Sequence, residues 1–177
     1  ALHGWKGKLY FKDYIHLYVL DLATGNITLL ADNMDIICYS RGRIYYCAYY
    51  YKDDKGTDYP RIYTAELDNI TPGSLKSLSD AKLLAVAPSD VLQIIWYEGS
   101  LWTASDVTRC AYCIDASTGK LQHTIQTASN ETAYGMEAIG RKLLAPSSDM
   151  SSTLSENVVI YDVQSGGKQL WSEFLGQ

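Results

Sequence analysis

LYVLDLATGNITLLA, residues 17–31, decides the fold, because it consists of an apolar strand, an acidic residue, a glycine turn and a second strand. Close copies return as AYCIDASTGKLQHTI at 111–125 and VVIYDVQSGGKQLWS at 158–172. A weaker copy, RIYTAELDNITPGSLKSL at 61–78, lacks the glycine at the turn position. The close copies predict β-hairpins, since glycine readily adopts the positive φ that such turns require.

The copies recur at a nearly constant spacing. Their acidic residues, Asp21, Glu66, Asp115 and Asp162, are 45, 49 and 47 residues apart. A second short hairpin with a glycine turn precedes each copy, as ALHGWKGKLYF, IICYSRGRIYYC, QIIWYEGSLWTA and GMEAIGRKLLAP. Two hairpins per period make a four-stranded antiparallel unit, and a period of about 45 residues is the size of one propeller blade.

The sequence therefore predicts an all-β fold, a β-propeller of about four four-stranded antiparallel blades. We expect one propeller domain or segment over residues 1–177, with blades at about 1–31, 32–78, 79–127 and 128–177. An ordinary β-sandwich with a chance internal echo is the alternative interpretation.

The best copies, AYCIDASTGK and VVIYDVQSGGKQLWS, resemble the quinoprotein (PQQ-like) β-propeller repeats, in which a strand leads to Asp, a glycine turn and a strand that often carries Trp. LYVLDLATGN matches without the Trp. The motif is short and shared by many propellers, so it supports the fold rather than a function. Rings of that family usually have seven or eight blades, which favours this chain being part of a larger ring, although four blades can also close alone. A second copy, in a homodimer, or further blades of a longer chain would complete it.

Composition narrows the class of protein. The chain is 47% hydrophobic and 20% charged, which is typical of a globular protein, and no run of about 18 apolar residues predicts a membrane span. We expect an extracytoplasmic or secreted location, in which Cys38 and Cys47, on neighbouring strands, would form a disulfide. Cys110 and Cys113 share one strand and point to opposite faces, which predicts buried apolar residues rather than a redox or metal pair.

Acidic residues are concentrated in one set of the predicted loops. In a four-stranded meander the 1–2 and 3–4 turns lie at one end, and the 2–3 loops and the links between blades lie at the other. The segments assigned to the second end hold 12 acidic and 5 basic residues, which gives them a net charge of −7, whereas the whole chain has a net charge of −5. These segments are 12–16, 31–35, 49–60, 79–90, 103–109, 126–133 and 146–157. An acidic end disfavours nucleic acid and anionic membranes and favours a basic protein or peptide. Solubility alone is the other explanation of this charge.

The most unusual segment is 49–60, which combines tyrosines with three aspartates around a glycine. Its tyrosines can offer stacking faces to a ligand. Asp53, Asp54 and Asp58 are weak metal candidates for a hard cation such as Ca²⁺, because their spacing fits no EF-hand and two lysines lie among them. The predicted binding residues are Tyr50, Tyr51, Asp53, Asp54, Asp58, Tyr59, Asp106, Arg109 and Asp149.

No catalytic signature is present: there is no GxSxG, HExxH or P-loop, and only three histidines occur. We predict no catalytic residue and no cofactor. The favoured hypothesis is a non-catalytic binding or scaffold module that presents an acidic, loop-rich face to a protein or peptide. The alternative is a propeller-type enzyme, a hydrolase, lyase or quinoprotein-like protein, with a central polar pocket lined by Asp35, Gln93 and Glu137.

Overall fold

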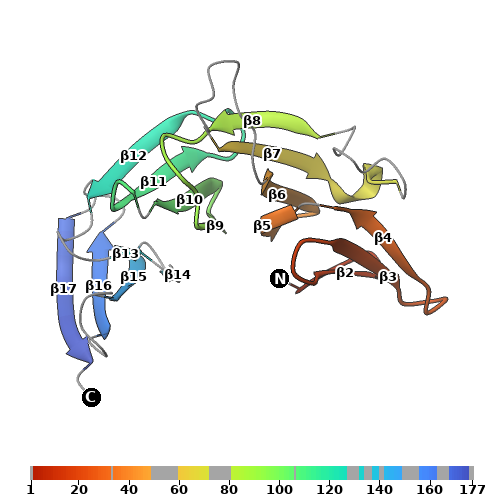
Figure 1. The fold of residues 1–177 in the computed structure, drawn as a ribbon, viewed down its shortest axis with the longest axis horizontal. Helices are drawn as coiled ribbons and strands as arrows, with labels where there is room; N and C mark the ends of the chain where they lie inside the picture. Colours follow the sequence, from red (N-terminus) through yellow and green to blue (C-terminus); the bar gives the residue numbers. More distant parts are fainter. Residues whose placement is uncertain are drawn as a thin grey trace. The chain divides into compact units, whose positions relative to one another are not determined.

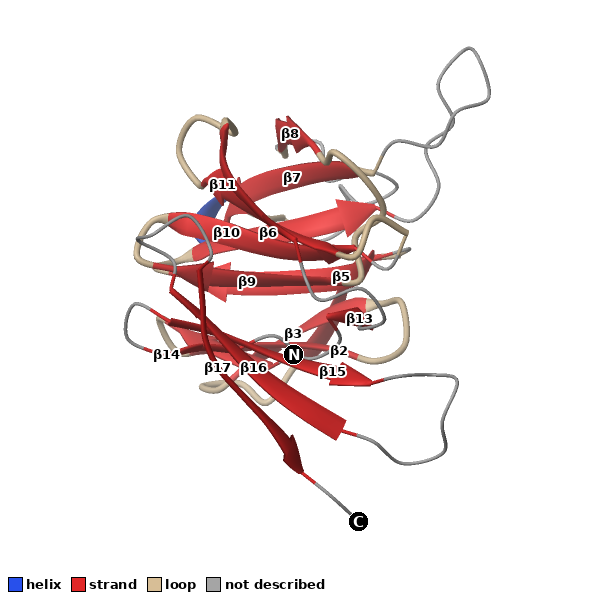
Figure 2. Cartoon of the chain, turned by 90° about the vertical axis from the view of Figure 1, so that its left-hand side faces the viewer, coloured by secondary structure: helices blue, strands red, loops and turns tan. Residues whose placement is uncertain are grey.

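The structure, a computed structural model, is all-β and describes most of the chain. The described residues are 2–32, 34–48, 60–71, 81–105, 107–126, 132–133, 137–139, 142–148, 156–162 and 168–175, with backbone alone at 35, 48 and from 132 onward. Within them the one helix is a 3₁₀ turn, η1 (Leu67–Asn69), and nearly all other regular structure is strand (Figure 2). The chain divides into two compact units, Ala1–Ala87 and Pro88–Gln177.

Unit 1 holds two four-stranded antiparallel sheets (Figure 1). Sheet 1 consists of β1 (Leu2–Trp5), β2 (Lys8–Lys12), β3 (Leu17–Asp21) and β4 (Ile27–Ala31), paired in chain order. Sheet 2 consists of β5 (Met34–Ser40), β6 (Arg43–Ala48), β7 (Arg61–Glu66) and β8 (Lys82–Val86), also in chain order. The predicted four-stranded antiparallel repeat is confirmed in both.

Unit 2 repeats the pattern. Sheet 3 consists of β9 (Gln93–Tyr97), β10 (Ser100–Ser105), β11 (Cys110–Asp115) and β12 (Leu121–Gln126). Sheet 4 consists of β13 (Thr132–Ala133), β14 (Glu137–Ile139), β15 (Lys142–Ser148), β16 (Glu156–Asp162) and β17 (Lys168–Leu175). In sheet 4 both short strands, β13 and β14, pair with β15, so their two segments together take the place of a first strand.

In sheets 1, 2 and 3 the first hairpin closes through a two-residue turn. Both central residues have positive φ in sheet 1, where Lys6 is at 45° and Gly7 at 74°, and in sheet 2, where Arg41 is at 49° and Gly42 at 74°. Positive φ at both positions defines the type I′ turn, whose twist matches that of the paired strands. The glycine in each turn motif thus has a direct conformational reason.

The second hairpin closes through its aspartate, and this explains the repeated Asp-x-x-Thr-Gly pattern. In sheet 1 the Asp21 carboxylate accepts hydrogen bonds from the Ala23 and Thr24 amides, both at 2.9 Å, and the Gly25 amide donates to the Asp21 carbonyl at 2.8 Å. Gly25 has a φ of 73°. Asp115 and Gly119 form the same turn in sheet 3. An aspartate side chain that bonds the following amides is a turn former in its own right.

The second repeat is longer than its predicted end at residue 78. Its fourth strand is β8, Lys82–Val86, so much of the 79–90 segment assigned to a link is strand of sheet 2. The physical reason is the missing glycine turn. After Glu66 the chain enters η1, where the Leu67 amide donates to the Gly42 carbonyl at 2.8 Å, and the return strand starts later.

Sheets 1 and 2 share one hydrophobic core. Tyr10, Leu17 and Val19 of sheet 1 are buried with Ile44 and Tyr46 of sheet 2. The Tyr10 hydroxyl, buried with them, donates to the Leu67 carbonyl at 3.3 Å, which satisfies a polar group inside the interface. The Trp5 ring lies directly over Gly42, and a Cβ at residue 42 would stand 2.4 Å from a Trp5 ring carbon.

The predicted disulfide between Cys38 and Cys47 is not formed in the structure. None of the four cysteines is disulfide-bonded, and Cys47, Cys110 and Cys113 are buried. The β5–β6 register places Tyr45 opposite Cys38 and Ile36 opposite Cys47. Residues diagonal to each other across two strands are about 7–8 Å apart, which is beyond the usual disulfide span. The expected disulfide between Cys38 and Cys47 is therefore wrong for this structure.

The Trp5–Gly42 contact generates a stability test with a matched control. Gly7 and Gly42 share a φ of 74°, but no atom lies within 4 Å of a Cβ built at Gly7. We expect Gly7→Ala to cost about 1 kcal/mol for the left-handed backbone alone. We expect Gly42→Ala to cost about 2–4 kcal/mol, because overpacking against Trp5 is added. Urea unfolding measures both free energies, and equal losses would contradict the packing role of Trp5.

The Asp115 turn generates a pH test. The Ser117 hydroxyl, and then the Thr118 and Ser117 amides, hold the pKa of Asp115 at about 2, below its ordinary 3.8. A lowered folded-state pKa stabilises the fold above the ordinary value, and that stability is lost as the pH falls toward 2. We expect the melting temperature of Asp115→Asn to fall less than that of the parent between pH 5 and pH 2.

Asp21→Asn is the comparator for this test, because Ala23 stands where the other turn has Ser117, and the pKa of Asp21 is also lowered, first by its bonds with Thr24. Its effect should have the same sign. Parallel melting curves for the parent and Asp115→Asn at every pH would show that the carboxylate does not stabilise the turn.

Candidate functional site

Most of the predicted binding residues lie outside the described part of the chain. This holds for Tyr50, Tyr51, Asp53, Asp54, Asp58, Tyr59, Asp106 and Asp149, and so for the three metal candidates. Arg109 is described: it precedes β11 with a φ of 54°, and its carbonyl accepts a hydrogen bond from the Gln126 side chain at 3.1 Å. The exposed Arg109 side chain is thereby held on a tight, well-bonded turn.

The polar residues predicted to line a central pocket are divided between the two units, with Asp35 in unit 1 and Gln93 and Glu137 in unit 2, so this stays a prediction. Gln93 is half-buried in β9, whereas Asp35 in β5 and Glu137 in β14 are described by backbone alone. His3 in the first strand of sheet 1 stacks on Tyr39 in the first strand of sheet 2, with ring centroids 4.9 Å apart. Burial lowers the pKa of His3 and raises that of Tyr39. Both rings are therefore uncharged at neutral pH.

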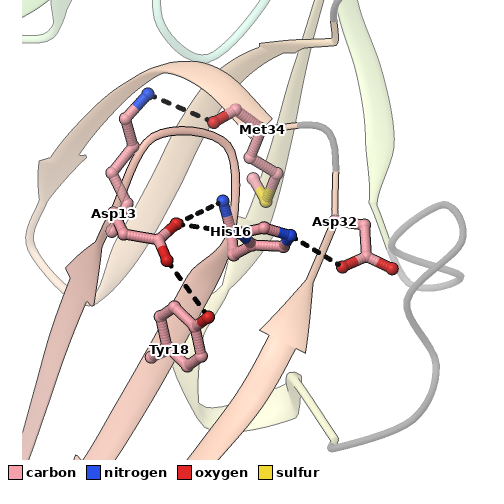
Figure 3. A network of polar contacts seen from close by, with 6 residues as sticks. Asp13, His16, Tyr18, Asp32 and Met34 are labelled. Atoms are coloured by element: carbon pink, nitrogen blue, oxygen red, sulfur yellow. Dashed lines mark hydrogen bonds and ion pairs between the residues drawn. The ribbon is translucent and has the colours of Figure 1, made fainter.

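A polar network does form at the end of sheet 1 where β2 passes into β3 (Figure 3). The Asp13 carboxylate accepts hydrogen bonds from the His16 amide at 3.0 Å and from the Tyr18 hydroxyl at 3.2 Å. It also lies 3.0 Å from Nδ1 of the His16 ring. The four-residue loop 13–16 is closed by these bonds, much as the aspartate closes the opposite turn. Tyr14, within this loop, is 85% exposed.

The same network reaches the link from sheet 1 to sheet 2. The other ring nitrogen of His16, Nε2, lies 3.8 Å from an Asp32 carboxylate oxygen, so the imidazole stands between two carboxylates (Figure 3). The Met34 amide donates to the Ile15 carbonyl at 2.8 Å, and the Lys12 ammonium donates to the Met34 carbonyl at 3.2 Å. The loop and the link therefore form one bonded surface, which we call the loop end of unit 1.

The charge state of this loop end follows from its bonds. Loss of water around Asp13 raises its pKa, but the bonds from the His16 amide, the His16 ring and Tyr18 outweigh this, so the pKa of Asp13 lies below its ordinary value. The same loss of water, and then the bond to Asp13, raises the pKa of Tyr18. Asp13 is thus ionised at neutral pH, and its side chain stays half exposed.

Sheet 3 has an equivalent network beside its 2–3 loop. The Asp90 carboxylate accepts hydrogen bonds from the Ser105 hydroxyl and, at 3.3 Å, from the Val107 amide. The Thr108 hydroxyl lies 2.8 Å from Ser105 and 2.7 Å from the Tyr112 hydroxyl. A carboxylate from a link and a hydroxyl from a strand again hold the loop, and Val107 in that loop is highly exposed.

Both networks hold their loops in place through hydrogen bonds. Within the described residues no group of three or more His, Cys, Asp or Glu side chains can hold a metal ion. The sequence analysis did not single out His16, because Asp32 belongs to the following link and the pairing depends on how the chain returns. The spacing of Asp13 and His16, three residues apart before a strand, is the signal that could have indicated the closed loop.

The sequence matches no protein-family model and no curated protein. Solved structures do match in fold. They include hydrazine synthase from Kuenenia stuttgartiensis, with a TM-score of 0.70 at 12% identity over 96% of this chain and 46% of that one. A putative TolB from Agrobacterium tumefaciens gives 0.63 at 16% over 97% and 63%. A nidogen/laminin complex gives 0.64 at 14% over 94% and 59%.

The chain spans less than two thirds of the length of each of these structures, and at this identity the likeness shows the fold alone. No helix in the described residues is long and apolar enough to cross a membrane. Because the neighbours include several kinds of propeller protein, they support propeller architecture without singling out the PQQ-like group. With its four-stranded antiparallel sheets in chain order, the chain has the β-propeller fold that its repeat predicts.

Proposed function

We propose that the chain is a non-catalytic binding or scaffold module whose loop end in unit 1 binds a basic segment of a protein or peptide. The observation that carries the proposal is Tyr14, an aromatic side chain that is 85% exposed on a loop held by Asp13 and His16. Aromatic residues of this kind are frequent anchors of protein interfaces. A loop that is already bonded in place loses little further freedom when a partner binds.

The carboxylates around Tyr14 supply the charge preference. Asp13 and Asp32 both keep about half of their side chains exposed, although His16 stands between them. They can therefore attract a lysine or arginine of a partner that packs on the Tyr14 ring. Such attraction between exposed groups adds specificity and speed of association more than affinity.

The 49–60 segment is joined to the same end of unit 1. It leaves from β6 at Ala48, which pairs with Met34, and returns to β7 at Arg61. Met34 is bonded to the loop through Ile15. We therefore retain the aspartates and tyrosines of this segment in the proposed surface, together with the acidic character of the whole loop end.

One structural neighbour supports this kind of role. The nidogen/laminin structure is by its title a complex of two proteins, and the chain that matches ours takes part in it. At 14% identity this supports protein binding as a use of the fold and indicates no partner. An extracytoplasmic or secreted location stays part of the proposal.

A displayed library of random peptides, selected on the immobilised chain, tests the proposal. We expect selected peptides to be enriched in Lys and Arg over Asp and Glu, with an affinity that weakens as salt is raised. Tyr14→Ala should lower the affinity about tenfold, because an interface anchor is lost. Leu22→Ala is the control, since Leu22 is also exposed but lies in the turn at the opposite end of sheet 1.

The contribution of the 49–60 segment is measured separately. The variant that replaces Tyr50 and Tyr51 by Ala and Asp53, Asp54 and Asp58 by Asn should also lose binding of the selected peptides. Peptides without a basic bias, or peptides that bind Tyr14→Ala as well as the parent, would contradict the proposed surface.

A further inference from the structure

Sheet 1 has two apolar faces, and only one of them packs on sheet 2. Side chains that are directly opposite on paired strands share a face, as Leu2, Phe11 and Tyr18 do through the β1–β2 and β2–β3 registers. We call this the back face. Its residues are Leu2, Gly4, Leu9, Phe11, Tyr18, Leu20, Ile27 and Leu29, and none is charged. The other, front face carries Tyr10, Leu17 and Val19, which are buried against sheet 2.

Sheet 2 contains the same back face in a buried setting. Counted from the turn glycines, Leu9 and Phe11 of sheet 1 correspond to Ile44 and Tyr46 of sheet 2. Ile44 and Tyr46 are part of the core shared with the front face of sheet 1. The back face of one sheet against the front face of its neighbour is therefore the contact that this chain itself builds.

The back faces of sheets 1 and 2 carry an equivalent stacked aromatic pair. Phe11 and Tyr18 stack across β2 and β3 with ring centroids 5.4 Å apart and planes inclined by 19°. Their counterparts Tyr46 and Tyr63 stack across β6 and β7 at 5.5 Å and 20°. In sheet 2 the pair lies in the interface, where Tyr46 is only 6% exposed. The pair in sheet 1 is half-buried, and it lies on the face of sheet 1 that does not pack on sheet 2.

The large apolar side chains of this face are exposed or half-buried. Leu2, Ile27 and Leu29 are all exposed, with Ile27 at 62%. Contiguous apolar patches of this kind commonly mark an interaction surface. The lack of charge on the back face argues for an apolar sheet as its occupant rather than for the basic segment proposed at the loop end.

We propose that the back face of sheet 1 binds the front face of a sheet in a second copy of this chain. Within unit 1 the back face of sheet 2 meets the front face of sheet 1, so the back face of sheet 1 matches, by repetition, the front face of another sheet. The contact between copies then continues the sheet 1–sheet 2 contact, and it closes if the rotation between two copies permits.

Sedimentation equilibrium of the chain over a concentration series tests this. We expect a mass of twice the monomer at about 100 μM or below, as for a moderate protein–protein affinity. Ile27→Lys should weaken the association at least about tenfold, because it places a charge in an apolar contact. Leu22→Lys is the matched control: its residue is 61% exposed, as Ile27 is 62% exposed, but it lies in the β3–β4 turn.

Far-UV circular dichroism verifies that each variant is folded, and Leu29→Lys on the same face provides a second variant should Ile27→Lys fail to fold. Larger oligomers that Ile27→Lys abolishes and Leu22→Lys preserves would also support contact between copies. A folded parent that is monomeric throughout would overturn the proposal and assign the face to further repeats of a longer polypeptide. Equal weakening by Ile27→Lys and Leu22→Lys would overturn it as well.

Discussion

Sheets 1 and 2 carry apolar side chains on both faces, and a sheet of this kind is stable only when both faces are shielded from water. The front face of sheet 1, with Tyr10 and Val19, meets the back face of sheet 2, with Ile44 and Tyr46, in one core. Neither sheet can satisfy this requirement alone. Repetition of the four-stranded unit meets part of it, because sheet 2 covers one face of sheet 1.

The turns at one end of the sheets and the loops at the other are held by different kinds of contact. At one end the type I′ turns and the aspartate turns are closed by their own short-range bonds, and Trp5 lies over Gly42 between the two sheets. At the other end longer loops and links meet, and their geometry depends on side chains such as Asp13 and His16. A constant end supports the packing, while the variable end can carry recognition without disturbing the core.

The period and the glycine turns predict most of the strands, because each hairpin is specified by a few neighbouring residues. The prediction fails at β8, since the copy after Glu66 lacks its turn and the chain there enters η1, bonded through Leu67 to Gly42 of the preceding hairpin. The sequence pattern also gives no sign of the His16 network, because the second carboxylate partner, Asp32, lies beyond β4 and reaches His16 only once sheet 1 has formed.

By itself the sequence determined the antiparallel hairpins, their turn types and the four-fold repetition, because strand alternation and turn chemistry act within a few residues. Tertiary structure alone decided which apolar faces meet. Phe11–Tyr18 and Tyr46–Tyr63 are the same stacked pair, yet only the second lies between two sheets. Burial is a property of what lies opposite a residue, and that is set by long-range packing rather than by the residue and its neighbours in the chain.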